Sequence, residues 1–122
     1  MLNNSYSQTI TVEENQTAAH LGSGTLLVFS TPAMVALMEN TAIQCLSDLA
    51  EGNTSVGISI NINHLKAIRV GSTVQCTAGI TAIEGRKYKF HVRVTDGAGE
   101  LVGEGSHERM VVNEEKFMAK IL

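Results

Sequence analysis

The first candidate for chemistry is a carboxylate within an apolar pattern. Glu39 lies midway along the longest apolar segment, Pro32 to Ala50. On a helix, its neighbours on one face are apolar, at offsets of three, four and seven: Val35, Ala42, Ile43 and Leu46. Because burying an unpaired carboxylate is costly, Glu39 is predicted to have either a partner or a chemical function.

A histidine at the end of the next apolar segment is the candidate partner. An alternation with a period of two residues places five side chains on one predicted strand face: Val56, Ile58, Ile60, Ile62 and His64. That face is apolar until its last member. Imidazole can take up or release a proton near neutral pH, so we expect His64 to act together with Glu39.

Thr31 and Pro32 indicate where the helix begins. Thr31 is suited to the N-cap and Pro32 to the first helical position, and Gly52 is a plausible stop, which gives about 19 residues. Thr31 precedes Glu39 by eight residues, or about 12 Å along a helix. Either the first turn is irregular, or the two side chains bracket a substrate from different positions.

The rest of the chain predicts strands. Ile10 and Val12 mark a short first strand, and 15–24 is a polar loop. Four further strands are expected in a meander, at 54–65, 73–83, 86–95 and 100–112, with hairpin turns at 84–85 and 96–99. Gly57 would interrupt the first of these four, either as a bulge or to expose its N–H, and Gly103 and Gly105 suggest a close backbone approach in the last.

We therefore predict an α+β fold in a single domain over residues 1–122. One long central helix would be wrapped by an antiparallel sheet of about five strands, because the helix is apolar on more than one stripe. Such a sheet leaves an edge strand open, which predicts self-association as a homodimer or a higher oligomer.

Composition excludes several functional classes. The formal net charge of −3 and the absence of Trp argue against nucleic-acid binding. No apolar run is long enough for a membrane span, and the N-terminus does not resemble a secretion signal. Cys45 and Cys76 are predicted to be reduced core thiols of a cytoplasmic protein. His20 and His91 have no metal-ligand spacing, so we expect no metal site.

Several segments together resemble the hotdog fold, and within it the fluoroacetyl-CoA thioesterase subgroup. The matching segments cover most of the chain from Phe29 onward: 29–39, Gly57 with His64 seven residues later, 83–86, 105–109 and 115–120. The combination of a Thr and a Glu eight residues apart with a later strand His is the specific element. The characterised fluoroacetyl-CoA enzyme has an aromatic lid where residues 22–27 contain no aromatic residue, so we expect a general short-chain acyl thioesterase.

The resemblance implies hydrolysis of an acyl-CoA or a similar thioester, with coenzyme A present only as part of the substrate and no separate cofactor. Thr31, Glu39 and His64 match the catalytic positions, and Gly57 matches a glycine whose backbone lies beside the thioester carbonyl. Glu39 would serve as a general base or attack directly, and His64 would activate water or relay a proton.

The roles of the basic residues stay open at this stage. His107 and Arg109 share one face of the last predicted strand, which is typical of a surface ion-pair strand. Contact with the phosphates of CoA by Arg109, Arg86 or Lys66 is the alternative. Two other functions also remain open: a hotdog dehydratase or hydratase acting on acyl thioesters, and a non-catalytic acyl-CoA-binding module.

Overall fold

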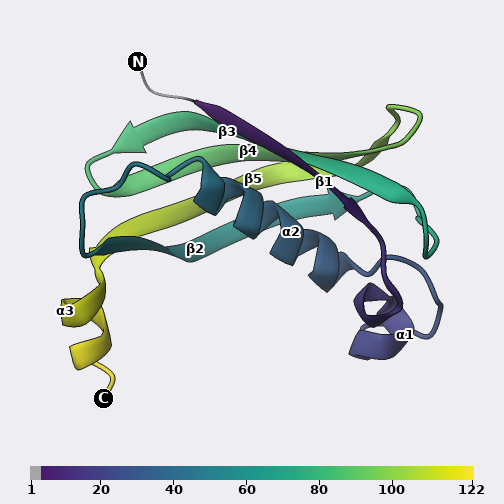
Figure 1. The fold of residues 1–122 in the computed structure, drawn as a ribbon, viewed down its shortest axis with the longest axis horizontal. Coiled ribbons are helices and arrows are strands. Elements are labelled where there is room, and N and C mark those ends of the chain that lie inside the picture. Colours follow the sequence, from purple (N-terminus) through teal and green to yellow (C-terminus); the bar gives the residue numbers. More distant parts are fainter. Residues whose placement is uncertain (1–3) are drawn as a thin grey trace.

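The computed structural model describes residues 4–122 and shows one antiparallel sheet with a helix against one of its faces (Figure 1). The strands are β1 (Ser5–Thr11), β2 (Asn53–His64), β3 (Thr73–Glu84), β4 (Lys87–Asp96) and β5 (Leu101–Asn113). The central helix is α2 (Thr31–Gln44). The 3-10 helix η1 (Glu14–Gln16) and the short helix α1 (Ala18–Leu21) lie at one end of the sheet, and α3 (Glu114–Ala119) lies at the other.

The strand order is β1-β3-β4-β5-β2, so the predicted four-strand meander is wrong in one respect. The strands β3, β4 and β5 form a meander, but β2 pairs with β5 and not with β3. The connection over residues 65–72 carries the chain from one edge of the sheet toward the other. On its way it forms an isolated bridge between Val28 and Arg69. As a result, β2 and β1 are the two edges of the sheet.

The helix begins and ends differently from the prediction. Ser30, not Thr31, is the N-cap, and its hydroxyl accepts a hydrogen bond from the amide of Ala33 at 3.1 Å. The helix has 14 residues, because after Gln44 the chain tightens into turns in which the amide of Leu46 donates to the carbonyl of Ile43. The prediction of about 19 residues was therefore too long, although Leu46 still packs in the core.

The core lies between α2 and the concave face of the sheet. The helix contributes Met34, Leu37, Met38 and Ala42, and β4 alternates as predicted, with Phe90, Val92 and Val94 buried. Cys45 and Cys76 are buried and unlinked, in agreement with the prediction of core thiols. Within residues 4–122, no helix is long and apolar enough to cross a membrane.

Two glycines of β5 let the sheet and the helix approach each other. A methyl group added at Gly103 would lie 2.7 Å from the sulfur of Met34 and 2.8 Å from the carbonyl oxygen of Asn63. A methyl group at Gly105 would collide with the carbonyl oxygen of Asn61 on the neighbouring strand. The predicted close approach of the last strand is therefore confirmed, and no other residue type fits there without a shift of the backbone.

Candidate active site

A bulge in β2 decides which of its side chains face the helix. The pairing with β5 shifts register between Gly57 and Ser59, so Ile58 is left over. After the bulge, Ile60 and Ile62 face the core, and His64 follows on the same side. Before the bulge, the alternation of side chains between the two faces of the sheet is reversed. The prediction that Val56 and Ile58 share the face of His64 is therefore wrong.

The first group of candidate catalytic residues consists of Thr31 and His64, which contact each other. The hydroxyl of Thr31 lies 2.8 Å from Nδ1 of His64. Because Ser30 caps the helix, the Thr31 side chain is free to make this contact. The pair lines a cavity of about 290 Å³, together with Val28, Phe29, Leu65, Lys66 and Ala67.

The second nitrogen of this imidazole is unsatisfied. Among the described residues, Nε2 of His64 is buried and has no hydrogen-bond partner. The ring of Phe29 packs against the imidazole edge to face, with centroids 6.4 Å apart. One nitrogen of His64 is thus bonded to a hydroxyl, and the other is available for a proton or for a further group. A hydroxyl and an imidazole in this arrangement can activate a nucleophile.

Glu39 belongs to a separate group of residues. Its carboxylate lies 3.8 Å from Nη1 of Arg109, and an added methyl at Gly57 would be only 2.8 Å from its Oε2. The partner of Glu39 within the chain is therefore Arg109, not His64 as predicted. The helix is regular from Thr31, so the spacing of about 12 Å along its axis holds and keeps Glu39 away from the Thr31–His64 pair.

The exposure of Glu39 also differs from the prediction. Its side chain is 40% exposed in the single chain, because α2 turns a different stripe of residues toward the sheet. The carboxylate lies at the rim of a cavity of about 300 Å³, which is also lined by Gly57, Ser59 and His107. Glu39 is therefore not buried as predicted, but its carboxylate does line a cavity.

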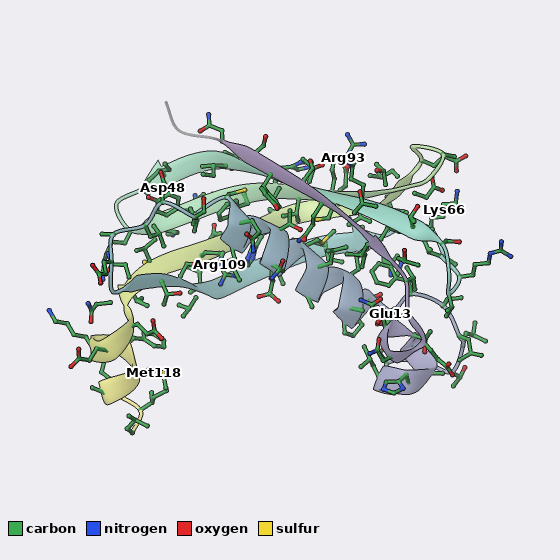
Figure 2. The ribbon with its side chains drawn as sticks, in the orientation of Figure 1. Glu13, Asp48, Lys66, Arg93, Arg109 and Met118 are labelled. Carbon is green, nitrogen blue, oxygen red and sulfur yellow. The ribbon has the colours of Figure 1, made fainter. Side chains whose placement is uncertain are left out.

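His107 and Arg109 are buried, which contradicts their interpretation as a surface ion-pair strand. They follow Gly103 and Gly105 at every second position of β5, on the face that meets the helix. This alternation was a signal in the sequence, because residues that share a face with close-approach glycines must also point inward. Figure 2 shows Arg109 between the sheet and α2.

Hydrogen bonds fix the protonation state of His107. Its Nδ1 lies 2.8 Å from the carbonyl oxygen of Ser59, which only accepts, so Nδ1 carries the proton. Its Nε2 lies 3.1 Å from Nη1 of Arg109, which only donates, so Nε2 accepts. The imidazole is therefore neutral. Burial lowers the pKa of His107, and the charge of Arg109 acts in the same direction.

Arg109 is held on two sides by Ser55. Its Nε donates to the Ser55 hydroxyl at 2.8 Å and its Nη2 to the Ser55 carbonyl at 3.0 Å. With His107 as a third acceptor, the guanidinium is fixed beside Glu39 at 4% exposure. The guanidinium therefore places a buried positive charge beside the Glu39 carboxylate. Ser55 and Ser59 are members of this group that the sequence analysis did not identify.

The other basic residues lie elsewhere. Arg86 is exposed, and its backbone carbonyl accepts from the amide of Val111, near the turn between β3 and β4. Lys66 donates to Asp96 at 2.5 Å and to Glu100 at 2.7 Å. Its charge is therefore matched by two carboxylates at the hairpin between β4 and β5. The structure does not bring Arg86 or Lys66 to Glu39.

Comparison with solved structures identifies the fold. A hot-dog-like protein from Thermanaerovibrio acidaminovorans superimposes with a TM-score of 0.88 over 98% of this chain and 89% of its own, at 23% identity. The FlK mutant solved in complex with acetyl-CoA superimposes with a TM-score of 0.92 at 31% identity, over 99% of this chain and 96% of its own. The protein therefore has the hotdog fold of the thioesterase superfamily.

Sequence comparison identifies the family within that fold. Residues 12–115 match the family FlK, described as fluoroacetyl-CoA-specific thioesterase. The fluoroacetyl-CoA thioesterase of Streptantibioticus cattleyicolor is 40% identical over 95 residues, which are 77% of this chain and 68% of that protein. The chain belongs to the FlK thioesterase family.

Proposed function

We propose that this chain hydrolyses a short-chain acyl-CoA thioester to the free acid and CoA. The observation that carries the proposal is the 2.8 Å contact between the Thr31 hydroxyl and His64 at the wall of a cavity. Membership of the FlK family supports the substrate class. The segment 22–27 contains no aromatic residue, and Leu26 and Leu27 there are exposed, which supports a general acyl group over a fluorinated one.

The chemistry divides between the two groups of residues. Water or the Thr31 hydroxyl attacks the thioester carbon, and His64 accepts the proton that is released. The C–S bond then breaks, and the CoA thiolate receives this proton from the imidazole. If Thr31 attacks, water releases the acid from the resulting ester in a second step. The backbone at Gly57 is the proposed neighbour of the carbonyl oxygen. Glu39 serves as a base, or it attacks the carbonyl itself, expels the CoA thiolate and forms an anhydride that water then hydrolyses to the acid.

The basic residues have different proposed tasks. Arg109 is buried and held by Ser55, so we place it beside the reacting end of the substrate, where it positions the Glu39 carboxylate. Arg86 is exposed and remains the candidate for contact with the phosphates of CoA. Cys45 and Cys76 are buried and unlinked, which supports the predicted reducing, cytoplasmic location.

Self-association is part of this proposal. The edge strand β2 has 12 residues and, although it contains a bulge, it has neither a charged residue nor a proline to protect a free edge. Antiparallel pairing of two such edges moves the Gly57 region of one chain toward the partner's His64. Glu39 of one chain would then approach the unsatisfied nitrogen of the other. We expect a dimer or a larger species by light scattering, and a monodisperse monomer at micromolar concentration would contradict this.

The decisive experiment is a hydrolysis screen over a panel of acyl-CoAs, with detection of the CoA thiol. We expect release of CoA from short-chain substrates, and His64→Ala should lower turnover by about 10²-fold or more, as is typical for a general base. His91→Ala is the matched control, because His91 lies on the exposed face of β4. If the wild-type protein binds acyl-CoA but releases no CoA, it is a binding module; if it instead dehydrates or hydrates the acyl chain, the dehydratase alternative holds.

A further inference from the structure

We propose that helix α3 of one chain covers the Thr31–His64 cavity of a second copy and forms one apolar wall of it. The inference rests on the proposed self-association along β2. It adds a structural element that the single chain leaves without a partner, and it assigns that element to the site of the other subunit.

Helix α3 and the residues that follow it carry apolar side chains that the described residues 4–122 leave partly exposed. The side chain of Asn113 caps the helix, accepting from the amide of Lys116, and none of the residues of α3 is buried. Phe117, Met118 and Ile121 expose between 37% and 68% of their surface. The helix extends from the end of β5 past the start of β2 (Figure 1), and Figure 2 shows Met118 well away from the sheet. Several exposed apolar side chains on one short segment are typical of an interaction site.

Exposed leucines also occur in the lining of the Thr31–His64 cavity and directly before it in sequence. Leu65 lines this cavity, and Leu26 and Leu27 precede Val28, which also lines it. These three leucines expose between 59% and 66% of their surface. Exposed apolar side chains therefore lie in and next to a cavity whose imidazole has a buried, unsatisfied nitrogen.

The two patches lie at opposite ends of the same open edge. Asn53, at the start of β2, pairs with Asn113, after which α3 begins, whereas His64 is the last residue of β2. Eleven steps of about 3.3 Å separate these ends by about 36 Å. Within one chain, α3 therefore cannot reach the leucines around the cavity.

A two-fold axis through paired β2 edges brings the patches together. Antiparallel pairing reverses the second strand, so the Asn53 end of one chain lies beside the partner's His64. Because α3 extends past the Asn53 end of β2, it would project toward the partner's His64 end. A two-fold interface contains every contact twice, once from each subunit. The apolar side chains of each α3 would therefore meet the leucines of the other subunit. Both apolar patches would be covered by this single arrangement.

The consequence for the reaction is a drier and narrower site. Apolar side chains from the partner would close the mouth beside Leu65 and strengthen the electrostatic interactions at His64. They would also form the surface against which the substrate lies. Access to the site would then depend on a helix that contributes no catalytic group.

Cysteine pairing between two variants tests this contact directly. One chain carries Leu65→Cys and the other carries Met118→Cys, and the two are mixed under mild oxidation. A disulfide requires Cα atoms within about 7 Å, so an intersubunit bond reports the contact itself. The native thiols do not interfere: both are buried, and burial raises the pKa of Cys76 to about 11. The matched control replaces Leu65→Cys with Ile83→Cys, an exposed apolar position on β3.

We expect a covalent dimer on a non-reducing gel from the Leu65→Cys and Met118→Cys mixture, and none from the control mixture. Disulfide formation in the Met118→Cys protein alone would place the two α3 helices against each other and overturn the proposal. An unlinked mixture, whether the protein is dimeric or monomeric by light scattering, would overturn it too. Because the gel does not depend on turnover, an inactive enzyme that forms the bond would refute the proposed function and leave this contact standing.

Discussion

Replacing Gly57 by alanine should displace the carboxylate of Glu39 and change the stability of the fold only slightly. Gly57 has no positive φ, so alanine causes no backbone strain there. Its methyl group would instead lie 2.8 Å from Oε2 of Glu39 and 3.3 Å from both Nη1 of Arg109 and Cε1 of His107. To reach an ordinary contact, the carboxylate must retreat from 2.8 Å to at least 3.4 Å.

The structure predicts unequal effects of Gly57→Ala on stability and on activity. Glu39 ends in a flexible, 40% exposed carboxylate, so the cost in unfolding free energy should be about 1 kcal/mol, the lower limit for overpacking. Displacing a reacting group by about 1 Å can lower the rate by about 10²-fold. We therefore expect kcat/KM to fall by about ten- to a hundredfold in a variant that remains folded.

The assay combines release of CoA thiol with urea unfolding. Gly79→Ala on β3 is the matched control, because its added methyl would meet the nearest backbone atom, the carbonyl oxygen of Asn4, at 3.8 Å, an ordinary contact. This control should keep the wild-type kcat/KM. If Gly57→Ala also kept it while remaining folded, the carboxylate of Glu39 would not need its observed position, and the reasoning about this group would be wrong.

Three further predictions concern Glu39, Asp96 and Cys76. Glu39→Gln should lower turnover by about 10²-fold or more with an unchanged circular dichroism spectrum, and full activity would leave Glu39 a structural carboxylate. The hydrogen bond from Lys66 lowers the pKa of Asp96, so its contribution to stability exists above the ordinary value of 3.8 and is lost as the pH falls through the folded value. Urea midpoints should thus decline less in acid for Asp96→Asn than for the wild type, and parallel declines would show that this ion pair does not contribute. Burial raises the pKa of Cys76 to about 11, so the native protein should resist thiol reagents at pH 8 and react in urea; rapid native labelling of Cys76 would contradict its burial.

The sequence by itself determined the elements and several of the chemical groups. Periodicity indicated one apolar helix and the strands that follow it, because the period of side chains on each face is a local property of the chain. The types and spacing of Thr31, Glu39, Gly57 and His64 indicated a thioesterase through resemblance. The four later strands were expected within one residue of their observed limits.

The tertiary structure decided which groups meet. The bulge after Gly57 depends on pairing with β5, about fifty residues away, and it reverses the side-chain phase on which the partnership of Glu39 and His64 was based. The cap was a choice between two adjacent hydroxyls, Ser30 and Thr31. That choice left Thr31 free to bond His64, 33 residues later.

The strand order and the burial of the charged group also required the whole fold. Each strand was recognisable alone, but only the crossing connection places β2 beside β5 and makes it an edge. His107 and Arg109 read as surface residues because charged side chains are usually exposed. Their burial is possible because Ser55, Ser59 and Glu39 supply acceptors and a counter-charge from two other elements, and no local pattern contains that information.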